Sequence, residues 1–288
     1  MKLVTFRQFG LQRPGALMDD GIADLSGAAS SVMELIERGL SGPALSELAR
    51  GTRQVPLNAV QLEAPIPSPS RNIFCVGKNY VAHAKEFQVS GFDLSSQAQE
   101  IPDVPIFFTK AVTSVIGPET LIPGYLDGTN SVDYEGELTV VIGRGGRGIS
   151  RADAYRHVYG YTIINDVTAR IIQQKHKQWF LGKSLDGFCP MGPAIVTADE
   201  VPDVTRLELR TLVNGEVRQQ AKLSDLIFDI PVLIETLSRG TTLMPGDLIA
   251  TGTPEGVGIG FKPPKFLKSG DLVEITIAPI GTLSNRVA

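Results

Sequence analysis

Two glutamates stand one residue apart at the start of an apolar run, and this spacing is the strongest chemical signal in the chain. Glu135 and Glu137 lead into LTVVI (138–142), a pattern typical of a buried strand. Side chains alternate along a strand, so both carboxylates are predicted to lie on one face, roughly 7 Å apart. Their mutual repulsion and burial make ionisation costly, and a hard divalent cation with oxygen ligands relieves both costs. The alternative is a solvated strand end with two unrelated glutamates.

A third acid, Asp166, ends the strand pattern VYGYTIIND (158–166) and precedes a helical pattern over residues 167–179. Aspartate is a favoured helix N-cap, and capping is the alternative to a chemical role. Arg170 and Gln173 follow four and seven residues later, on the helix face that Asp166 would begin. An acid, a guanidinium and an amide in line fit recognition of an anionic ligand beside a metal, although a solvated helix face has the same spacing.

A candidate general base lies in a short helix predicted over residues 80–87. His83 and Glu86 are three residues apart and therefore neighbours on that helix. The carboxylate can orient the imidazole and raise its basicity, whereas a surface His–Glu pair would have no such role. Lys183 is flanked by small and apolar residues, and a simple surface lysine is the alternative there too. The turn 252–256 (GTPEG) could present backbone amides to an anion.

The elements that must position these residues are mostly strands. Residues 1–65 are predicted to form a small N-terminal α+β domain, with a strand at 1–7, a turn region at 21–24 and a helical region at 31–50. Prolines at positions 65, 67 and 69 give a stiff connector. Strand patterns dominate residues 70–288, which favours a mixed, sandwich or barrel-like sheet over a doubly wound fold. The polar, irregular segment 88–105 is predicted to be a lid that closes over substrate, and a permanently ordered loop packed at a dimer contact is the alternative.

The composition of the chain indicates which classes of binding partner and which cellular location to expect. The chain has 288 residues, 42% hydrophobic and 20% charged, with a net charge of −4, which gives no reason to expect nucleic acid or a membrane surface as a partner. No stretch approaches the ~18 apolar residues of a membrane-spanning helix, so a cytoplasmic protein is expected. Two cysteines, Cys75 and Cys189, are predicted to be reduced core thiols, and three histidines give no zinc pattern.

Several short motifs, taken in order, resemble the fumarylacetoacetate hydrolase family over roughly residues 65–288. The matching stretches are GKNYVAHAKEF, the Glu135-Gly136-Glu137 pair, INDVTAR, FLGKSLDGFCPMGP, LVNGEV and LIATGTPEGVG. The resemblance implies a strand-dominated mixed α/β fold with a β-roll or barrel-like sheet body over residues 70–288. It also implies a homodimer.

The resemblance assigns roles to individual residues. Glu135, Glu137 and Asp166 match the family's ligands for one Mg²⁺ or Mn²⁺ per subunit. His83 and Glu86 match its water-activating pair. The other matches are a catalytic lysine and the substrate-binding positions: Lys183, Tyr80, Arg170, Gln173 and Thr253.

The implied reaction is metal-assisted cleavage of a carbon–carbon bond in a β-diketo acid such as an acylpyruvate. His83, oriented by Glu86, would deprotonate the attacking water, and Lys183 would stabilise the departing pyruvate enolate. Decarboxylation of an oxaloacetate-type β-keto acid and enol–keto isomerisation use the same enolate and are the main alternatives. A non-catalytic ligand-binding protein is a distant alternative, because binding alone requires no base.

Overall fold

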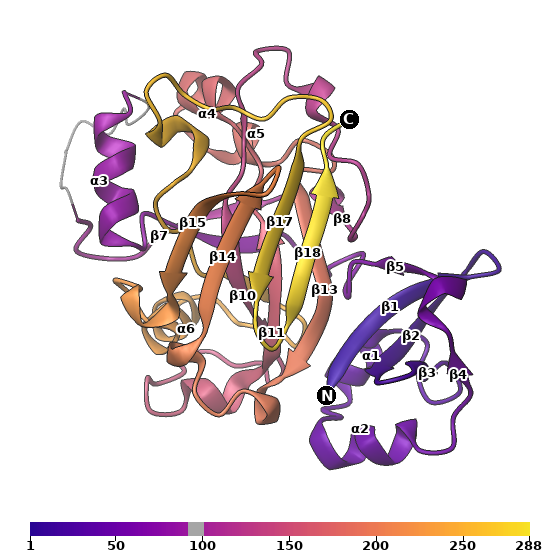
Figure 1. The fold of residues 1–288 in the computed structure, drawn as a ribbon. Helices are drawn as coiled ribbons and strands as arrows, with labels where there is room; N and C mark the ends of the chain where they lie inside the picture. The colour runs from indigo at the N-terminus through magenta and orange to yellow at the C-terminus, as the bar shows by residue number, and fades with distance from the viewer. Residues whose placement is uncertain (92–100) are drawn as a thin grey trace.

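The computed structural model describes residues 1–91 and 101–288, and strands dominate it (Figure 1). In spatial order, the main path of the largest sheet is β4 (Gln54–Val55), β3 (Gly21–Asp24), β2 (Leu11–Met18), β1 (Lys2–Gln8), β13 (Cys189–Thr197), β11 (Val158–Asn165), β10 (Gly136–Ile142), β16 (Leu248–Ala250), β6 (Ile73–Gly77) and β7 (Ile106–Lys110). Off this path, β5 (Gln61–Glu63) pairs with β1, and β8 (Val115–Ile116) pairs with β13.

A second sheet packs against the first. Its order is β15 (Glu216–Lys222), β14 (Glu208–Val213), β17 (Leu272–Ile277) and β18 (Gly281–Arg286). Apolar side chains from both sheets, including Val140, Ile163, Leu209 and Ile275, form one buried core between them. The strand-dominated mixed fold predicted from sequence is confirmed, and over the residues described neither sheet closes into a barrel.

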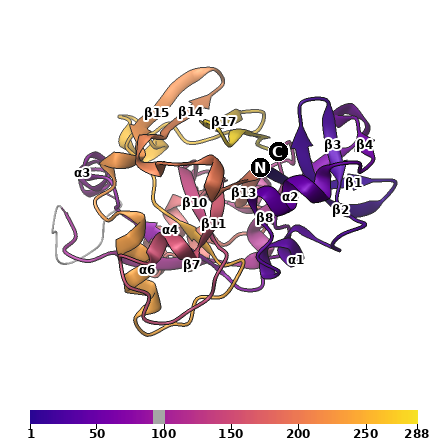
Figure 2. The ribbon, with the colours of Figure 1, turned by 90° about the horizontal axis from the view of Figure 1, so that it is seen from below.

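The N-terminal residues form the indigo lobe beside the main body (Figure 2). Its sheet is continuous with that of the body, because Leu3 of β1 pairs with Ile195 of β13. The division into domains 1–65 and 70–288 therefore stays a prediction. The predicted turn region 21–24 is wrong: it forms β3, which pairs with β2 and β4 and buries Ile22.

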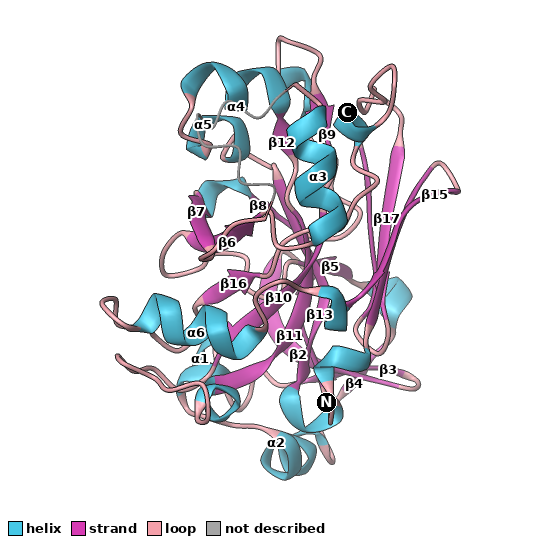
Figure 3. Cartoon of the chain, turned by 90° about the vertical axis from the view of Figure 1, so that its left-hand side faces the viewer, coloured by secondary structure: helices cyan, strands magenta, loops and turns pink. Residues whose placement is uncertain are grey.

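The helical region predicted over 31–50 is two helices, α1 (Val32–Glu37) and α2 (Gly42–Ala49). α1 ends just before Gly39, whose φ of 64° lies in the left-handed region that favours glycine. The other helices are α3 (Val81–Val89), α4 (Arg170–His176), α5 (Phe180–Lys183) and α6 (Ile230–Ser238). α3, α4 and α5 gather toward one end of the molecule, and α1 and α2 lie toward the other (Figure 3).

Two predictions about segments near the candidate site need correction, and a third lies largely outside the described residues. The strand predicted through Glu135 is interrupted, since β9 (Val132–Asp133) ends before it and β10 begins after it. The helix after Asp166 begins only at Arg170, because β12 (Thr168–Ala169) first pairs with β9. The predicted lid overlaps α3 at residues 88–89, and its central part, 92–100, lies outside the described residues.

Within the described residues, no helix combines the length and apolar character needed to cross a membrane. Both cysteines are free and buried, as predicted for core thiols.

Candidate active site

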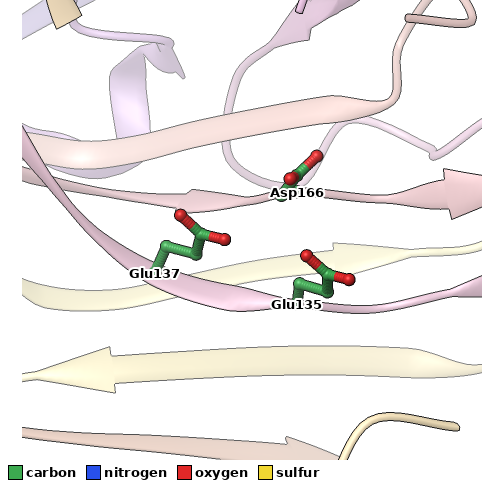
Figure 4. Close-up of side chains that lie close together, drawn as sticks. All are labelled: Glu135, Glu137 and Asp166. Atoms are coloured by element: carbon green, nitrogen blue, oxygen red, sulfur yellow. The ribbon is translucent and has the colours of Figure 1, made fainter. Parts of the chain in front are cut away.

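Three carboxylates meet where β10 begins and β11 ends (Figure 4). Antiparallel pairing sets Gly136 opposite Asn165, which brings Glu135 and Glu137 beside Asp166. One oxygen from each carboxylate lies within 4.8 Å of the others, and all three side chains are buried. Asp166 does not cap a helix, since the N-cap of α4 is Ala169. The residues predicted to bind metal therefore form one compact group of oxygen donors.

Burial and charge give these carboxylates different protonation behaviour. Burial, together with the negative charges of Asp166 and Glu135, raises the pKa of Glu137 well above its ordinary value. Burial also opposes ionisation of Glu135, but the positive charges of Lys183 and Arg170 outweigh it and lower the pKa to about 2. The neighbouring cations therefore stabilise the negative charge of Glu135 but not that of Glu137. Three buried carboxylates in this state fit a hard divalent cation such as Mg²⁺ or Mn²⁺.

We expect Mn²⁺ binding to expel a proton from Glu137. A raised pKa keeps this side chain protonated in a pH range where a free glutamate is ionised, whereas a metal ligand must be ionised. Calorimetric titration at about pH 6 in two buffers of different protonation enthalpy should give different heats, corresponding to up to about one proton per site. The difference should shrink as the pH rises. Heats that do not depend on the buffer at any pH would contradict the raised pKa.

Two buried lysines hold these carboxylates in place. Lys183, the last residue of α5, donates from Nζ to Glu135 Oε2 at 2.7 Å and to Asp166 Oδ2 at 2.8 Å. Lys110, at the end of β7, donates to Asp166 Oδ1 at 2.7 Å, to the Val167 carbonyl at 3.0 Å and to the Lys183 carbonyl. Lys183 is thus not a surface lysine. Nothing in the motif spacing predicts Lys110; its one signal is a lysine that closes the apolar strand IFFTK.

Arg170 and Gln173 face each other across the first turn of α4. The Arg170 guanidinium lies 2.6 Å from Glu135 Oε1, and its Nη1 donates to Gln173 Oε1 at 3.3 Å. Its Nε donates to Asp133 Oδ2 at 2.9 Å. Both side chains are buried and line the same pocket as Glu135 and Glu137. The alternative, a solvated helix face, is therefore ruled out for this pair.

His83 and Glu86 come together on α3 as predicted. His83 Nδ1 lies 3.2 Å from Glu86 Oε2, and the imidazole is only 5% exposed. Glu86 Oε1 accepts a hydrogen bond at 2.9 Å from the backbone N–H of Gly256, in the GTPEG turn. Because Nδ1 faces Glu86, Nε2 is the ring nitrogen that can act on a ligand.

One pocket joins the base to the carboxylates. It has an empty volume of about 310 Å³ and is lined by Val76, Gly77, Lys78, His83, Phe87, Phe108, Glu135, Glu137, Arg170, Gln173, Trp179, Lys183 and Thr253. Trp179 packs edge-on to Phe108, with ring centroids 5.2 Å apart. A Cβ on Gly77 would overlap the Trp179 ring, so only glycine permits this close approach.

The GTPEG turn reaches the pocket, as the sequence suggested. The Gly252 N–H donates to Glu137 Oε2 at 2.8 Å, and the Thr253 hydroxyl accepts from Gln219 Nε2 at 2.8 Å. Tyr80, which was predicted to bind substrate, is not among the described residues that line the pocket. Its backbone forms a bridge with Leu226, and its side chain is buried at the start of α3.

Comparison with known proteins gives consistent matches. Residues 72–288 match a family model described as fumarylacetoacetate (FAA) hydrolase, C-terminal. Oxaloacetate tautomerase YisK of Bacillus subtilis (strain 168) is 46% identical over 310 residues, covering 100% of both chains. A fumarylacetoacetate hydrolase from psychrophilic Exiguobacterium antarcticum is 42% identical with a TM-score of 0.86, covering 100% of this chain and 99% of that one. Maleylpyruvate hydrolase from Sphingobium sp. SYK-6, in complex with manganese(II) and pyruvate, is 33% identical with a TM-score of 0.81, covering 100% and 99%.

Proposed function

The chain belongs to the fumarylacetoacetate hydrolase family, and on that premise we propose that it is a divalent-metal-dependent enzyme that interconverts the enol and keto forms of a small 2-keto acid of the oxaloacetate type. The observation that carries the proposal is that His83 shares one pocket with Lys183, Glu135 and Glu137, and that these two glutamates are grouped with Asp166. The end-to-end likeness to an oxaloacetate tautomerase supports isomerisation ahead of the hydrolysis that the motifs first suggested.

Enolisation needs a base beside a carbon and positive charge beside an oxygen. His83, oriented by Glu86, takes the proton from the carbon next to the keto group, and the electron pair moves onto the keto oxygen. Lys183 contributes positive charge beside that oxygen. Return of a proton to the oxygen gives the enol, and the reverse sequence gives the keto acid.

Glu135, Glu137 and Asp166 are the residues that would hold the metal. A bound divalent cation would act there as a Lewis acid toward the carboxylate and keto oxygens of the substrate. The manganese(II) in the maleylpyruvate hydrolase relative supports Mn²⁺ as readily as Mg²⁺.

The pocket also suits a small anionic substrate. Lys78, Arg170 and Lys183 supply positive charge, and Gln173 and Thr253 supply polar contacts. The homodimer implied by the family resemblance stays a prediction.

Hydrolysis of an acylpyruvate is the second candidate. The His83–Glu86 pair could instead deprotonate water, and the likeness to maleylpyruvate hydrolase supports this reading. Decarboxylation of oxaloacetate forms the same type of enolate, but it needs no base to remove a proton from carbon. If the protein is a decarboxylase, its activity should therefore survive the loss of His83.

The three reactions separate in one product assay. We expect protein loaded with Mn²⁺ to accelerate the loss of the oxaloacetate enol well above its spontaneous rate, with little pyruvate formed over the same interval. Chelator-treated protein is the control for metal dependence. Faster release of pyruvate with carbon dioxide would indicate decarboxylation, and faster cleavage of an acylpyruvate would indicate hydrolysis. No turnover of any of these substrates would contradict an enzymatic role on keto acids.

A further inference from the structure

Asp133 is a fully buried carboxylate to which the proposed chemistry gives no role. Its Oδ1 accepts from the backbone N–H groups of Tyr134 at 2.9 Å and Gly258 at 2.6 Å. Its Oδ2 accepts from Arg170 Nε at 2.9 Å and from the Ile259 N–H at 3.1 Å. Asp133 is not among the described residues that line the pocket.

One partner of Asp133 leads to the carboxylate group. Arg170 spans from Asp133 to Glu135, which its guanidinium meets at 2.6 Å. A guanidinium is a rigid planar fork, so fixing its Nε end also fixes the end that faces Glu135. Asp133 therefore sets where Arg170 holds a predicted metal ligand.

The other partners lead to the predicted base. The loop 256–260 that Asp133 pins also carries Gly256, whose N–H binds Glu86. A Cβ on Gly260 would overlap the Glu86 carboxylate, so this loop lies directly against it. Val257 and Ile259 of the loop pack with Phe87 of α3 in one apolar cluster. The loop is thus the surface on which α3, with His83, is seated.

We propose that Asp133 is a positioning residue that sets the His83–Glu86 pair relative to the carboxylate group. It holds Arg170 and the loop 256–260 at once, and so connects the two halves of the pocket with a single side chain. The inference rests on the proposed function, because it takes His83 to be the base. Misplacing a catalytic group by about 1 Å can cost about 10²-fold in rate, so this connection should matter for turnover.

Asp133→Asn tests the proposal. The amide nitrogen cannot accept a hydrogen bond, so it faces donors and loosens the grip on Arg170 or on the loop. We expect kcat to fall about 10- to 100-fold while KM changes less than about fivefold. The Kd for Mn²⁺ should weaken by less than kcat falls, because all three metal ligands remain and Asp133 reaches them only through Arg170. An unchanged kcat, or a Kd that weakens more than kcat falls, would overturn the proposal.

A readout independent of activity comes from Trp179, the one tryptophan in the sequence. Its ring packs edge-on to Phe87 of α3, with centroids 6.1 Å apart. A shift of α3 should therefore change its emission spectrum and its quenching by acrylamide. If the wild-type protein has no keto-acid activity, the proposed function fails, but the fluorescence still reports whether Asp133 positions α3. Unchanged fluorescence in Asp133→Asn would overturn the inference.

Two further variants separate positioning from stability. Asp247→Asn is the matched control: Asp247 is also a buried carboxylate that pairs with an arginine, Arg71, and accepts a backbone N–H at 2.7 Å, but it precedes β16 away from the pocket lining. It should lower the thermal midpoint and leave kcat and fluorescence unchanged. Gly260→Ala disturbs the loop against Glu86 without altering Asp133, and should reproduce both the loss of kcat and the fluorescence change. Wild-type values of both in Gly260→Ala would overturn the proposal, even if Asp133→Asn does not fold.

Discussion

Glu137→Ala should weaken Mg²⁺ or Mn²⁺ binding beyond detection in calorimetry. Loss of a residue that only supports a metal ligand typically costs 10- to 100-fold in affinity, so loss of a buried ligand should cost at least about 100-fold. Glu137 is 1% exposed, and one of its carboxylate oxygens lies within 4.8 Å of an oxygen of Glu135 and of Asp166. Water does not easily replace a ligand at so buried a position.

Glu255→Ala is the matched control for this experiment. Glu255 is an exposed acid in the GTPEG turn, so its removal deletes one negative charge near the pocket without deleting a ligand. Its metal affinity should stay at the wild-type value. Wild-type affinity in Glu137→Ala would instead remove this side chain from the metal site.

Thermal unfolding gives a second view of Glu137. A ligand that binds the folded state alone raises the thermal midpoint, and Glu137→Ala should abolish the rise that Mn²⁺ produces in the wild type. Without metal, the raised pKa of Glu137 means that the folded state holds a proton the unfolded state has released. Its contribution to stability is therefore fully present below the unfolded-state pKa and falls as the pH rises above it. The metal-free variant should lose less stability on raising the pH than the wild type does.

The sequence predicted the carboxylate group for a partly wrong reason. Alternation along a single strand was expected to align Glu135 with Glu137, but Glu135 lies in the break between β9 and β10. Its position instead depends on the backbone, because the Asp166 N–H donates to the Glu135 carbonyl at 2.8 Å. Residue types and order were sufficient to identify the acids, whereas the local backbone that joins them was not readable from periodicity.

Short sequence patterns could not predict the contacts between segments that are distant in the chain. Gly256 and Glu86 are 170 residues apart in sequence, and they meet because β16 and β6 are neighbours in the sheet. Lys110 reaches Asp166 for a related reason, since β7 pairs with β6 at that edge. Strand order is a property of the whole chain. A motif can therefore identify His83 or Asp166, but it cannot reveal the role of Lys110 or the hydrogen bonds of Asp133 to Arg170 and the loop 256–260.

His83→Ala should retain metal binding and lose turnover. His83 faces Glu86 and is not one of the three grouped acids, so the Kd for Mn²⁺ should stay near the wild-type value. A general base contributes about 10²- to 10⁴-fold to a reaction rate, and enol–keto conversion should slow by that factor. Rates measured at saturating Mn²⁺ and keto acid exclude weaker binding as the cause.

Val81→Ala, on an exposed position of the same helix, controls for damage to α3 and should keep the wild-type rate. Glu86→Gln should fall between the two, because it leaves the imidazole in place but removes the charge and one of the two acceptor oxygens that hold it. A loss below about tenfold in His83→Ala, with metal retained, would mean that the reaction does not use this base. His83→Ala could also lose isomerisation and keep decarboxylation of oxaloacetate. In that case the carboxylate group would be sufficient for the loss of carbon dioxide, and His83 would be required only where a proton moves to or from carbon.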